Sequence, residues 1–517
     1  MTRPRLALLA AITMALVLIP AAGAASATQP NIIVVQTDDQ DNGTVNERVM
    51  PNVMRLISGV GTTFTDYIDS GPLCCPSRAV LLTGQYGHNN GVLWNGPNSY
   101  GDLVGKDNTL PVWLQQAGYV TAHVGKYLNN YGRAVPPNEV APGWDEWHTA
   151  LEGAHTVPYY DYRLRENGNP VDYGSAPRDY ITRVLNDKAV HLIHEYVPGP
   201  KPLFLALDQI APHIGPNKTE RCRGAPLPYR ADMDKFVHSP LPESPAFNEA
   251  DVSDKPRFVR LKPRLTPDDI ANLQRVNGCR LAALQSVDRG IEHIVDALKD
   301  EGALQNTAII YTSDNGYLLG QHREVAKVVP YEKSLHVPFV MRVPPGFRPS
   351  GGVPQSLSST VANVDIAPTL LDLAGAQPCP STGPCRVLDG RSLLPAIKSD
   401  GHSWPQHRAI PLELDGARAE ANSPCKYRGL RTTGLVYIEY QGVVPPGESP
   451  GNCEPDNEVE HYNLRADPFE LDNIFPAPSG TPEALQEQQL AARVARLADC
   501  AGIRGRDPAP ASGHYCE

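Results

Sequence analysis

The sequence predicts an α/β core in which a doubly wound, mostly parallel sheet is sandwiched by helices, followed by a smaller carboxy-terminal α+β subdomain. The core is predicted because short, continuously apolar segments alternate with helical patterns, and because 41% hydrophobic residues can supply a large interior. The subdomain is predicted because short β-like segments and loops rich in Pro and Gly prevail after about residue 400. The expected boundaries are 28–405 for the core and 406–517 for the subdomain.

The amino terminus has the pattern of an export signal. Two arginines precede the apolar run from Leu6 to Ile19, and Ala25-Ser26-Ala27 offers a cleavage site. We therefore expect a signal peptide over residues 1–27 and a secreted mature chain. The alternative is an uncleaved membrane anchor, but the run is short and ends at Pro20. We expect no stable membrane insertion, since no later segment is long and apolar enough to span a bilayer.

Two predicted strands are each followed directly by acidic side chains. The apolar segment 31–36 precedes Asp38-Asp39, and the apolar segment 308–312 precedes Asp314-Asn315. In open α/β sheets ligands bind beyond the carboxyl ends of the strands. The two acidic strand ends are therefore predicted to meet in one site, although they lie far apart in the sequence.

Other segments complete the predicted core. Thr266 is placed as an N-cap before Pro267, and the apolar residues that follow keep a spacing of three or four up to Leu298, apart from a gap around Arg280. This pattern predicts one long amphipathic helix. Shorter elements are predicted as helices over 109–117 and 482–497 and as strands over 119–124, 203–207 and 435–438.

The segment from Cys74 to Gly84, CCPSRAVLLTG, reads as a loop that runs into a helix. A helix amino terminus presents unpaired N–H groups, and Arg78 adds a cation, so the segment suits a sulfate or phosphate group. On residue types alone, Cys74 and Cys75 would more often be disulfide partners or a buried pair.

This segment resembles the signature of the formylglycine-dependent type I sulfatases of the alkaline phosphatase-like superfamily, C-x-P-S-R-x-x-x-L-T-G, at every specified position. The resemblance implies that a maturation enzyme oxidises Cys74 to formylglycine (3-oxoalanine), whose hydrated aldehyde carries the nucleophilic oxygen. It also implies one Ca²⁺, with Mg²⁺ as the alternative, since hard oxygen ligands suit both ions. The implied ligands are Asp38, Asp39, the modified Cys74, Asp314 and Asn315.

The same resemblance implies catalytic roles for Arg78, Lys126, Lys327 and His213. The two lysines correspond to sulfate-binding residues, and His213 corresponds to a histidine near the leaving oxygen, where it can act as a general acid. Without that context a lone Lys is usually a solvated group and a lone His is usually structural. Leu128 departs from many arylsulfatases, which have a histidine at this position, and so leaves one catalytic role unassigned.

Three stretches together resemble the branch of N-acetylglucosamine-6-sulfatases and extracellular heparan sulfatases: residues 74–78, 87–90 and 125–129. His88 is then a candidate substrate contact, with a polar loop as the alternative. The net charge of −11 predicts no nucleic-acid partner and makes action along a heparan chain doubtful. We expect a small or terminal sulfated sugar, or an aryl sulfate, as the substrate.

Two other functions stay open at this point. The chain could hydrolyse phosphonate monoesters or phosphate diesters, because related enzymes do so and the pocket would bind a tetrahedral oxyanion in either case. It could also be an unmatured, non-catalytic protein that binds sulfated glycans, in which Cys74 is never oxidised. The complete set of charged site residues argues against the second alternative, since unpaired buried charges are costly to retain.

Cysteines outside the motif are expected to form disulfides in an oxidising compartment. If Cys74 is modified and Cys75 stays free, eight of the ten remain. Their connectivity does not follow from the sequence, but neighbours suggest three pairs. These are Cys379 with Cys385, Cys425 with Cys453, and Cys500 with Cys516.

Overall fold

The fold is that of a computed structural model, which describes residues 29–517 apart from 97, 137, 152–156, 217–218, 354, 417–421 and 448–451. The predicted signal peptide lies outside the described residues. Within those that are described, no helix combines the length and the apolar character needed to cross a membrane.

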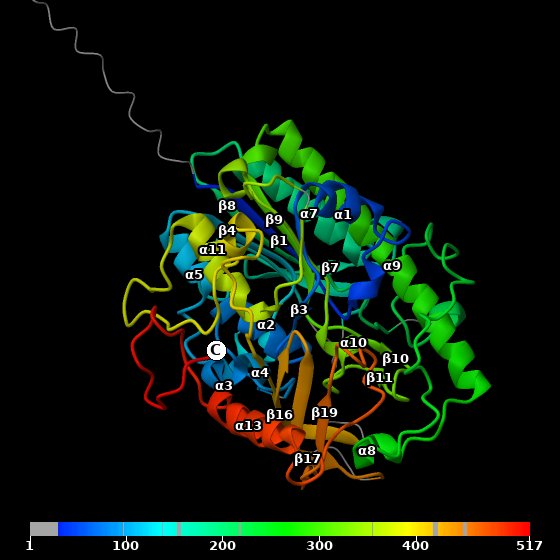
Figure 1. Cartoon of the computed structure of the whole chain (residues 1–517). Helices are drawn as coiled ribbons and strands as arrows, with labels where there is room; N and C mark the ends of the chain where they lie inside the picture. The colour runs from blue at the N-terminus through cyan, green and yellow to red at the C-terminus, as the bar shows by residue number, and fades with distance from the viewer. Residues whose placement is uncertain are drawn as a thin grey trace, which may run out of the picture.

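A ten-stranded mixed sheet forms the centre of the molecule (Figure 1). Its central strands β9, β1, β8, β4 and β5 are parallel, as predicted, and antiparallel pairs occur toward both edges. In spatial order the strands are β13 (Gln355–Leu357), β2 (Thr62–Phe64), β12 (Phe339–Arg342), β9 (Thr307–Ser313), β1 (Asn31–Thr37), β8 (Leu203–Asp208), β4 (Val120–Lys126), β5 (Glu146–Ala150), β6 (Tyr162–Glu166) and β7 (Asn169–Tyr173).

Both faces of this sheet are buried. Because successive side chains of a strand point to opposite faces, Ile32 and Val34 join one apolar cluster while Ile33 and Val35 join another. The first cluster includes side chains of α2 (Cys74–Thr83), α5 (Leu110–Gln116) and α11 (Ile366–Ala374). The second includes side chains of α7 (Ile181–Tyr196) and α9 (Pro267–Asp300). The doubly wound core is thereby confirmed (Figure 1).

The shorter elements connect these layers. They comprise two small two-stranded sheets and several short helices. The strands are β3 (Tyr67–Ile68), β10 (Leu318–Leu319), β11 (Val325–Ala326) and β14 (Val361–Ala362). The helices are α1 (Pro51–Leu56), α3 (Gly87–Asn90), α4 (Ser99–Asp102), α6 (Tyr131–Ala134), α8 (Arg257–Arg260), α10 (Glu332–Leu335) and α12 (Leu394–Lys398).

The carboxy-terminal part carries a separate antiparallel sheet and the helix α13 (Pro482–Leu497). Side chains of this sheet, such as Tyr427, share one apolar cluster with Leu73 and Val80 beside α2. The subdomain is therefore packed directly against the region that holds Cys74. Its strands are β15 (Ile410–Asp415), β16 (Ser423–Thr432), β17 (Leu435–Val444), β18 (Glu454–Pro455) and β19 (Val459–Tyr462).

Four disulfides are formed, and the three suggested pairs are among them. The fourth joins Cys222 to Cys279 and ties a loop to α9. Cys74 and Cys75 are both buried, and neither is in a disulfide. The cysteine that the motif singles out is thus not consumed by a disulfide.

Candidate active site

The two acidic strand ends meet, as the sequence predicted. β1 and β9 are adjacent and parallel, with Thr37 paired to Ser313, so Asp38-Asp39 and Asp314-Asn315 leave the sheet at the same edge. The backbone N–H of Asp39 donates to Oδ1 of Asp314 over 3.1 Å, and Nδ2 of Asn315 donates to Oδ1 of Asp39 over 2.7 Å. All four side chains are buried.

Cys74 is the first residue of α2 and lies beside these carboxylates. Its Sγ is 3.5 Å from Oδ1 of Asp38 and 2.8 Å from Nζ of Lys327. The helix ends where Gly84 adopts a left-handed conformation, at φ 63°. Because α2 starts at Cys74, the positive end of the helix dipole lies at this cysteine. The backbone N–H of the next residue, Cys75, donates to Oδ1 of Asn95 over 2.9 Å.

Four further cationic or titratable groups surround the cluster. Lys126 Nζ lies 2.5 Å from Asp38, Lys327 is bonded to Asp39, and His213 Nε2 lies 3.8 Å from Asp39. Arg78 donates from Nε to Asp314 over 2.9 Å. The structure therefore brings together all of the predicted site residues except His88.

Mutual electrostatics set the ionisation of this cluster. Burial opposes the charge of Asp38, but Lys126, His213 and Lys327 outweigh it and hold the pKa of the carboxyl below its usual range. Burial and the charge of Asp38 raise the pKa of Asp314 to about 6. Burial and the same neighbouring charge raise the pKa of Cys74 to about 12, so its side chain is a neutral thiol.

The oxygen atoms at this edge fit a hard cation. Oδ1 of Asn315 is buried and accepts no hydrogen bond in the described part of the chain. Ligand atoms of Asp38, Asp39, Cys74 and His213 also lie within 4.8 Å of one another. Carboxylate and amide oxygens are the ligands that Ca²⁺ and Mg²⁺ prefer. Asn315 with the neighbouring aspartates could therefore hold such an ion.

Comparison with known proteins identifies the family to which this arrangement belongs. The family profile described as Sulfatase matches residues 30–376. The chain belongs to the sulfatase family. It is 37% identical to an arylsulfatase of Volvox carteri over 94% of this chain and 77% of that protein. It is also 30% identical to human N-acetylglucosamine-6-sulfatase, over 94% of this chain and 87% of the relative.

Other relatives of this sulfatase family member are longer. A putative extracellular sulfatase Sulf-1 homolog of Caenorhabditis elegans is 35% identical over 72% of this chain, which spans about half (49%) of that relative. Among solved structures, one described as a complex with its substrate D-glucosamine-2-N,6-O-disulfate has a TM-score of 0.72. The alignment with that structure covers 90% of this chain and 97% of the other chain at 24% identity, so the similarity supports the fold.

Two site residues, Asp208 and His123, were not singled out from the sequence. They extend the site on the side of Arg78 that faces away from Asp314. Asp208 accepts from Nη1 of Arg78 over 3.1 Å and lies 3.1 Å from Nε2 of His123. Nδ1 of His123 is in turn hydrogen-bonded to Thr149 at 2.8 Å. Asp208 ends a parallel strand, β8, so the pattern that predicted Asp38 could also have found it.

Arg280 explains the gap in the apolar pattern of α9. Its guanidinium donates to the backbone carbonyl of Asp39 and lies 3.9 Å from the ring centroid of Tyr317. Only 2% of this residue is exposed. The polar residue interrupts the apolar face because it reaches the site instead of the core.

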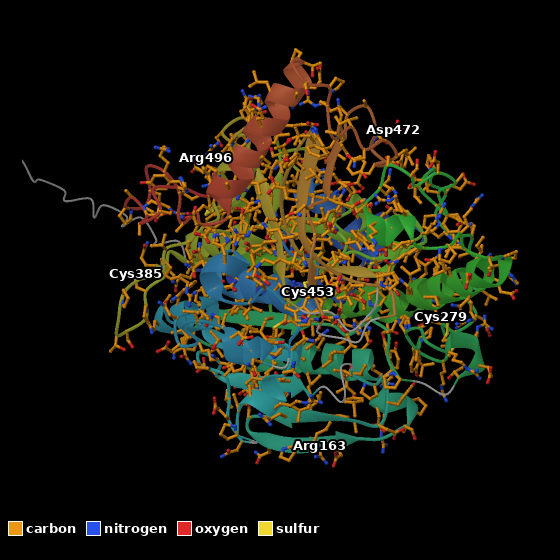
Figure 2. The ribbon with its side chains drawn as sticks, turned by 90° about the horizontal axis from the view of Figure 1, so that it is seen from below. Arg163, Cys279, Cys385, Cys453, Asp472 and Arg496 are labelled. Carbon is orange, nitrogen blue, oxygen red and sulfur yellow. A yellow bond between two sulfur atoms is a disulfide. The ribbon has the colours of Figure 1, made fainter. Side chains whose placement is uncertain are left out.

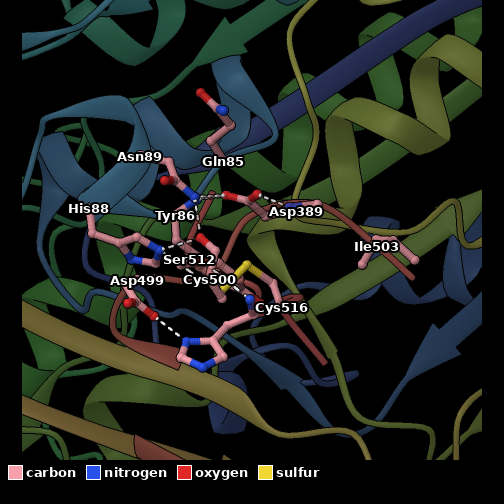
Figure 3. The surroundings of a disulfide bond; sticks show 12 residues. Gln85, Tyr86, His88, Asn89, Asp389, Asp499, Cys500, Ile503, Ser512 and Cys516 are labelled. Atoms are coloured by element: carbon pink, nitrogen blue, oxygen red, sulfur yellow. Dashed lines mark hydrogen bonds and ion pairs between the residues drawn. A yellow bond between two sulfur atoms is a disulfide. The ribbon is translucent and has the colours of Figure 1, made fainter. Parts of the chain in front are cut away.

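His88 lies in a different environment (Figure 3). Its Nδ1 is 2.8 Å from Glu413, and its Nε2 is 2.9 Å from the carbonyl oxygen of Cys500. Both ring nitrogens are thus engaged with the carboxy-terminal part of the chain. These contacts favour a structural role for His88, which lies in the short helix α3 and not in a polar loop. Substrate binding by His88 stays an untested prediction.

Proposed function

We propose that the chain hydrolyses sulfate monoesters with a formylglycine made from Cys74. The placement of Cys74 carries the proposal: this buried residue starts α2, and its Sγ faces the Asp38 carboxylate and the Lys327 ammonium. When formed, the hydrated aldehyde supplies the nucleophilic oxygen for attack on sulfur and releases sulfate without attack by water on sulfur.

The chain's own residues supply binding and orientation. Lys126 and Lys327 offer donors for sulfate oxygens, and the positive end of the α2 dipole lies at the same site. Arg78 is fixed by Asp314 and Asp208, so it holds its position as a cation without reorganising. His213 lies on the side of Asp39 and is proposed to protonate the leaving oxygen.

The proposed metal is one Ca²⁺, with Mg²⁺ as the alternative, held by Asp38, Asp39, Asp314, Asn315 and the modified Cys74. Bound there, the ion would polarise the sulfate oxygens and offset the charge of the carboxylates. The proposed substrate is a terminal sulfated sugar such as N-acetylglucosamine-6-sulfate, or an aryl sulfate. Relatives with those names support this class. We also propose a secreted protein that depends on a formylglycine-generating maturation enzyme.

Replacement of Cys74 by Ala tests the proposed nucleophile. We expect sulfate release from an aryl sulfate and from N-acetylglucosamine-6-sulfate to fall to background, with the melting temperature almost unchanged. Cys75→Ala is the matched control, because Cys75 is also buried and outside any disulfide but occupies the variable position of the motif. It should retain most of the activity. Turnover by Cys74→Ala would refute the mechanism.

Side-by-side rates on sulfate and phosphonate esters separate the main alternative. A phosphonate monoester hydrolase of Agrobacterium radiobacter has the same fold at a TM-score of 0.65 and 19% identity. We expect kcat/KM to be higher for the sulfate ester. A higher value for the phosphonate ester would reassign the reaction.

Replacement of Asp314 by Ala tests the metal site. Asp314 is buried, so its loss removes a ligand and leaves Arg78 without its main carboxylate partner. We expect Ca²⁺ affinity, measured by calorimetry, to fall at least about tenfold, as for the loss of a charged ligand. Asp172→Asn, at an exposed ion pair with Arg163, should leave the affinity unchanged. Equal Ca²⁺ affinity of the Asp314→Ala protein would contradict the assigned ligands.

A further inference from the structure

A second polar groove lies on the carboxy-terminal part of the molecule. One half, of about 660 Å³, is lined by residues of β17, β19 and α13, and the adjoining half, of about 440 Å³, by residues that follow β13 and α12. Gln406, Thr433 and Arg465 line both halves, so the two are adjacent. Volumes of roughly 300–1,000 Å³ are typical of ligand pockets. None of the lining residues belongs to the cluster around Cys74.

The groove concentrates positive charge in an acidic protein. Arg465, Arg493 and Arg496 line its larger half, and Figure 2 shows Arg496 on α13. Among the ion pairs of the described residues, none involves these three arginines, and Asp400 is the only carboxylate along the described lining. Partial burial and the charge of Arg496 lower the pKa of Arg493. Like charges held together without a carboxylate favour an anionic ligand.

Neutral hydrogen-bonding groups flank the arginines. The same half is lined by Gln486 and Gln489 of α13 and by Asn463 and Thr433. The hydroxyl of Thr433 is also hydrogen-bonded to that of Thr360 at 2.6 Å. Amides and hydroxyls can both donate and accept, which matches the hydroxyl groups of a sugar. Guanidinium groups match a tetrahedral oxyanion with several fixed N–H donors. The lining therefore suits a ligand that combines sugar hydroxyls with anionic groups.

Some of the groove residues leave the large sheet at the same edge as the site residues. β13 is parallel to β2, and both run in the direction of β9, because β12 lies antiparallel between β2 and β9. Residues 358–360, which line the groove, therefore leave the sheet at the edge where Asp314 leaves it. In the sheet order β13 is four positions from β1, which corresponds to about 19 Å.

We propose that this groove binds a sulfated oligosaccharide, with Arg465, Arg493 and Arg496 contacting its sulfate groups. The choice of sulfate as the anion rests on the proposed function. The groove supplies locally the positive charge that the whole chain, at −11, does not.

Calorimetric titration of the full chain carrying Cys74→Ala, which removes the proposed nucleophile, tests this proposal. The probe is a 6-O-sulfated glucosamine oligosaccharide, compared with its unsulfated counterpart and with inorganic sulfate. Adding Arg465→Gln, Arg493→Gln and Arg496→Gln should weaken binding of the sulfated probe about tenfold or more. Arg493 also donates to the carbonyl of His407 over 2.9 Å, so the Arg465→Gln, Arg496→Gln double variant is measured as well.

The matched control is Arg178→Gln, Arg183→Gln and Lys201→Gln, which removes the same charge from other exposed positions. It should bind the probe as the parent does. In the chain with an intact Cys74, the groove variants should hydrolyse a small aryl sulfate at the parent rate, so a failure of the proposed function appears there and not in the titration. Equal loss of binding in control and groove variants would overturn the proposal. So would equal affinity for the unsulfated probe, or for inorganic sulfate alone.

Discussion

Arg78 connects the cluster around Cys74 to the neighbouring strands β4 and β8. Its guanidinium bonds to Asp314 on one side and to Asp208 on the other, and it also donates to the carbonyl of Lys126 over 2.8 Å. Asp208 contacts His123, which is 1% exposed. These contacts hold the guanidinium of Arg78 in place beside the cluster around Cys74. Asp208 and His123 are therefore assigned a positioning role.

Asp208→Asn should lower kcat and leave KM nearly unchanged. The substitution removes the carboxylate charge that strengthens the hydrogen bond from Arg78 and leaves a neutral acceptor in its place. The difference between a charge-assisted and a neutral hydrogen bond is about 1–1.5 kcal/mol, which corresponds to roughly 5- to 10-fold in rate. Asp208→Glu should recover part of the loss, since it restores the charge. Steady-state kinetics on an aryl sulfate provide the measurement. A change confined to KM, or no rescue by Glu, would contradict the positioning role.

How far the site follows from the sequence depends on the residue. Asp38, Asp39, Asp314 and Asn315 directly follow apolar strands, so their convergence follows from the parallel sheet. Arg280 left only a gap in a periodic pattern, because its partners lie on distant loops. His123 left no signal, since a single histidine inside an apolar strand does not reveal the carboxylate that it contacts.

At the scale of elements, β4 delivers Lys126 to the site and depends on the glycine before it. Gly125 has φ 116°, and a Cβ there would lie 1.8 Å from the backbone oxygen of Asp208 on the neighbouring strand β8. Only glycine fits this close approach. The strand end that carries Lys126 is thus set by contact between two backbones.

Gly125→Ala should lower the free energy of unfolding by roughly 2 kcal/mol or more. The added Cβ would force the backbone of β4 or β8 to move, which would disturb the sheet. We expect a lower melting temperature and a lower kcat together. Gly346→Ala is the matched control, since nothing lies within 4 Å of the added Cβ. Equal melting temperatures for the two variants would show that the close approach is not a constraint.

Strands and helices differed in how well they could be predicted. Segments such as 31–36 and 308–312 were recognised because strands buried on both faces are continuously apolar. β6 and β7 were not predicted, since they are short and β7 has no buried residue. α9 begins at Pro267, as expected, because the hydroxyl of Thr266 accepts from the N–H of Asp269.

At the scale of the whole molecule, the carboxy-terminal part contacts the core at α3, next to the helix α2 that begins at Cys74. His88 bonds to Glu413 of β15. It also bonds to the carbonyl of Cys500, whose disulfide partner is Cys516, and Asn89 bonds to Asp389 (Figure 3). The domain boundaries near residue 405 stay a prediction. The shared apolar cluster indicates that the two parts are stable together.

This junction should make stability depend on pH. Burial opposes the charge of His88, but Glu413 and the nearby Asp389 outweigh it and raise its pKa to about 9 from an ordinary 6.5. The contribution of this contact to the free energy of unfolding is therefore complete below about pH 6.5 and is lost as pH rises through about 9, by up to roughly 3 kcal/mol. The melting temperature of the parent should exceed that of His88→Gln at pH 6 and converge toward it near pH 10. His514→Gln, at an exposed pair with Asp499, is the control. A constant gap would contradict the assignment.

Peptide mass spectrometry of the protein from its native host tests most directly whether Cys74 becomes the proposed catalytic group. We predict that the peptide containing Cys74 is lighter by about 18 Da than its sequence requires, which is the mass change from thiol to aldehyde that creates the nucleophile. Cys75 should remain a thiol. An unmodified Cys74 in a preparation that hydrolyses sulfate esters would contradict the account.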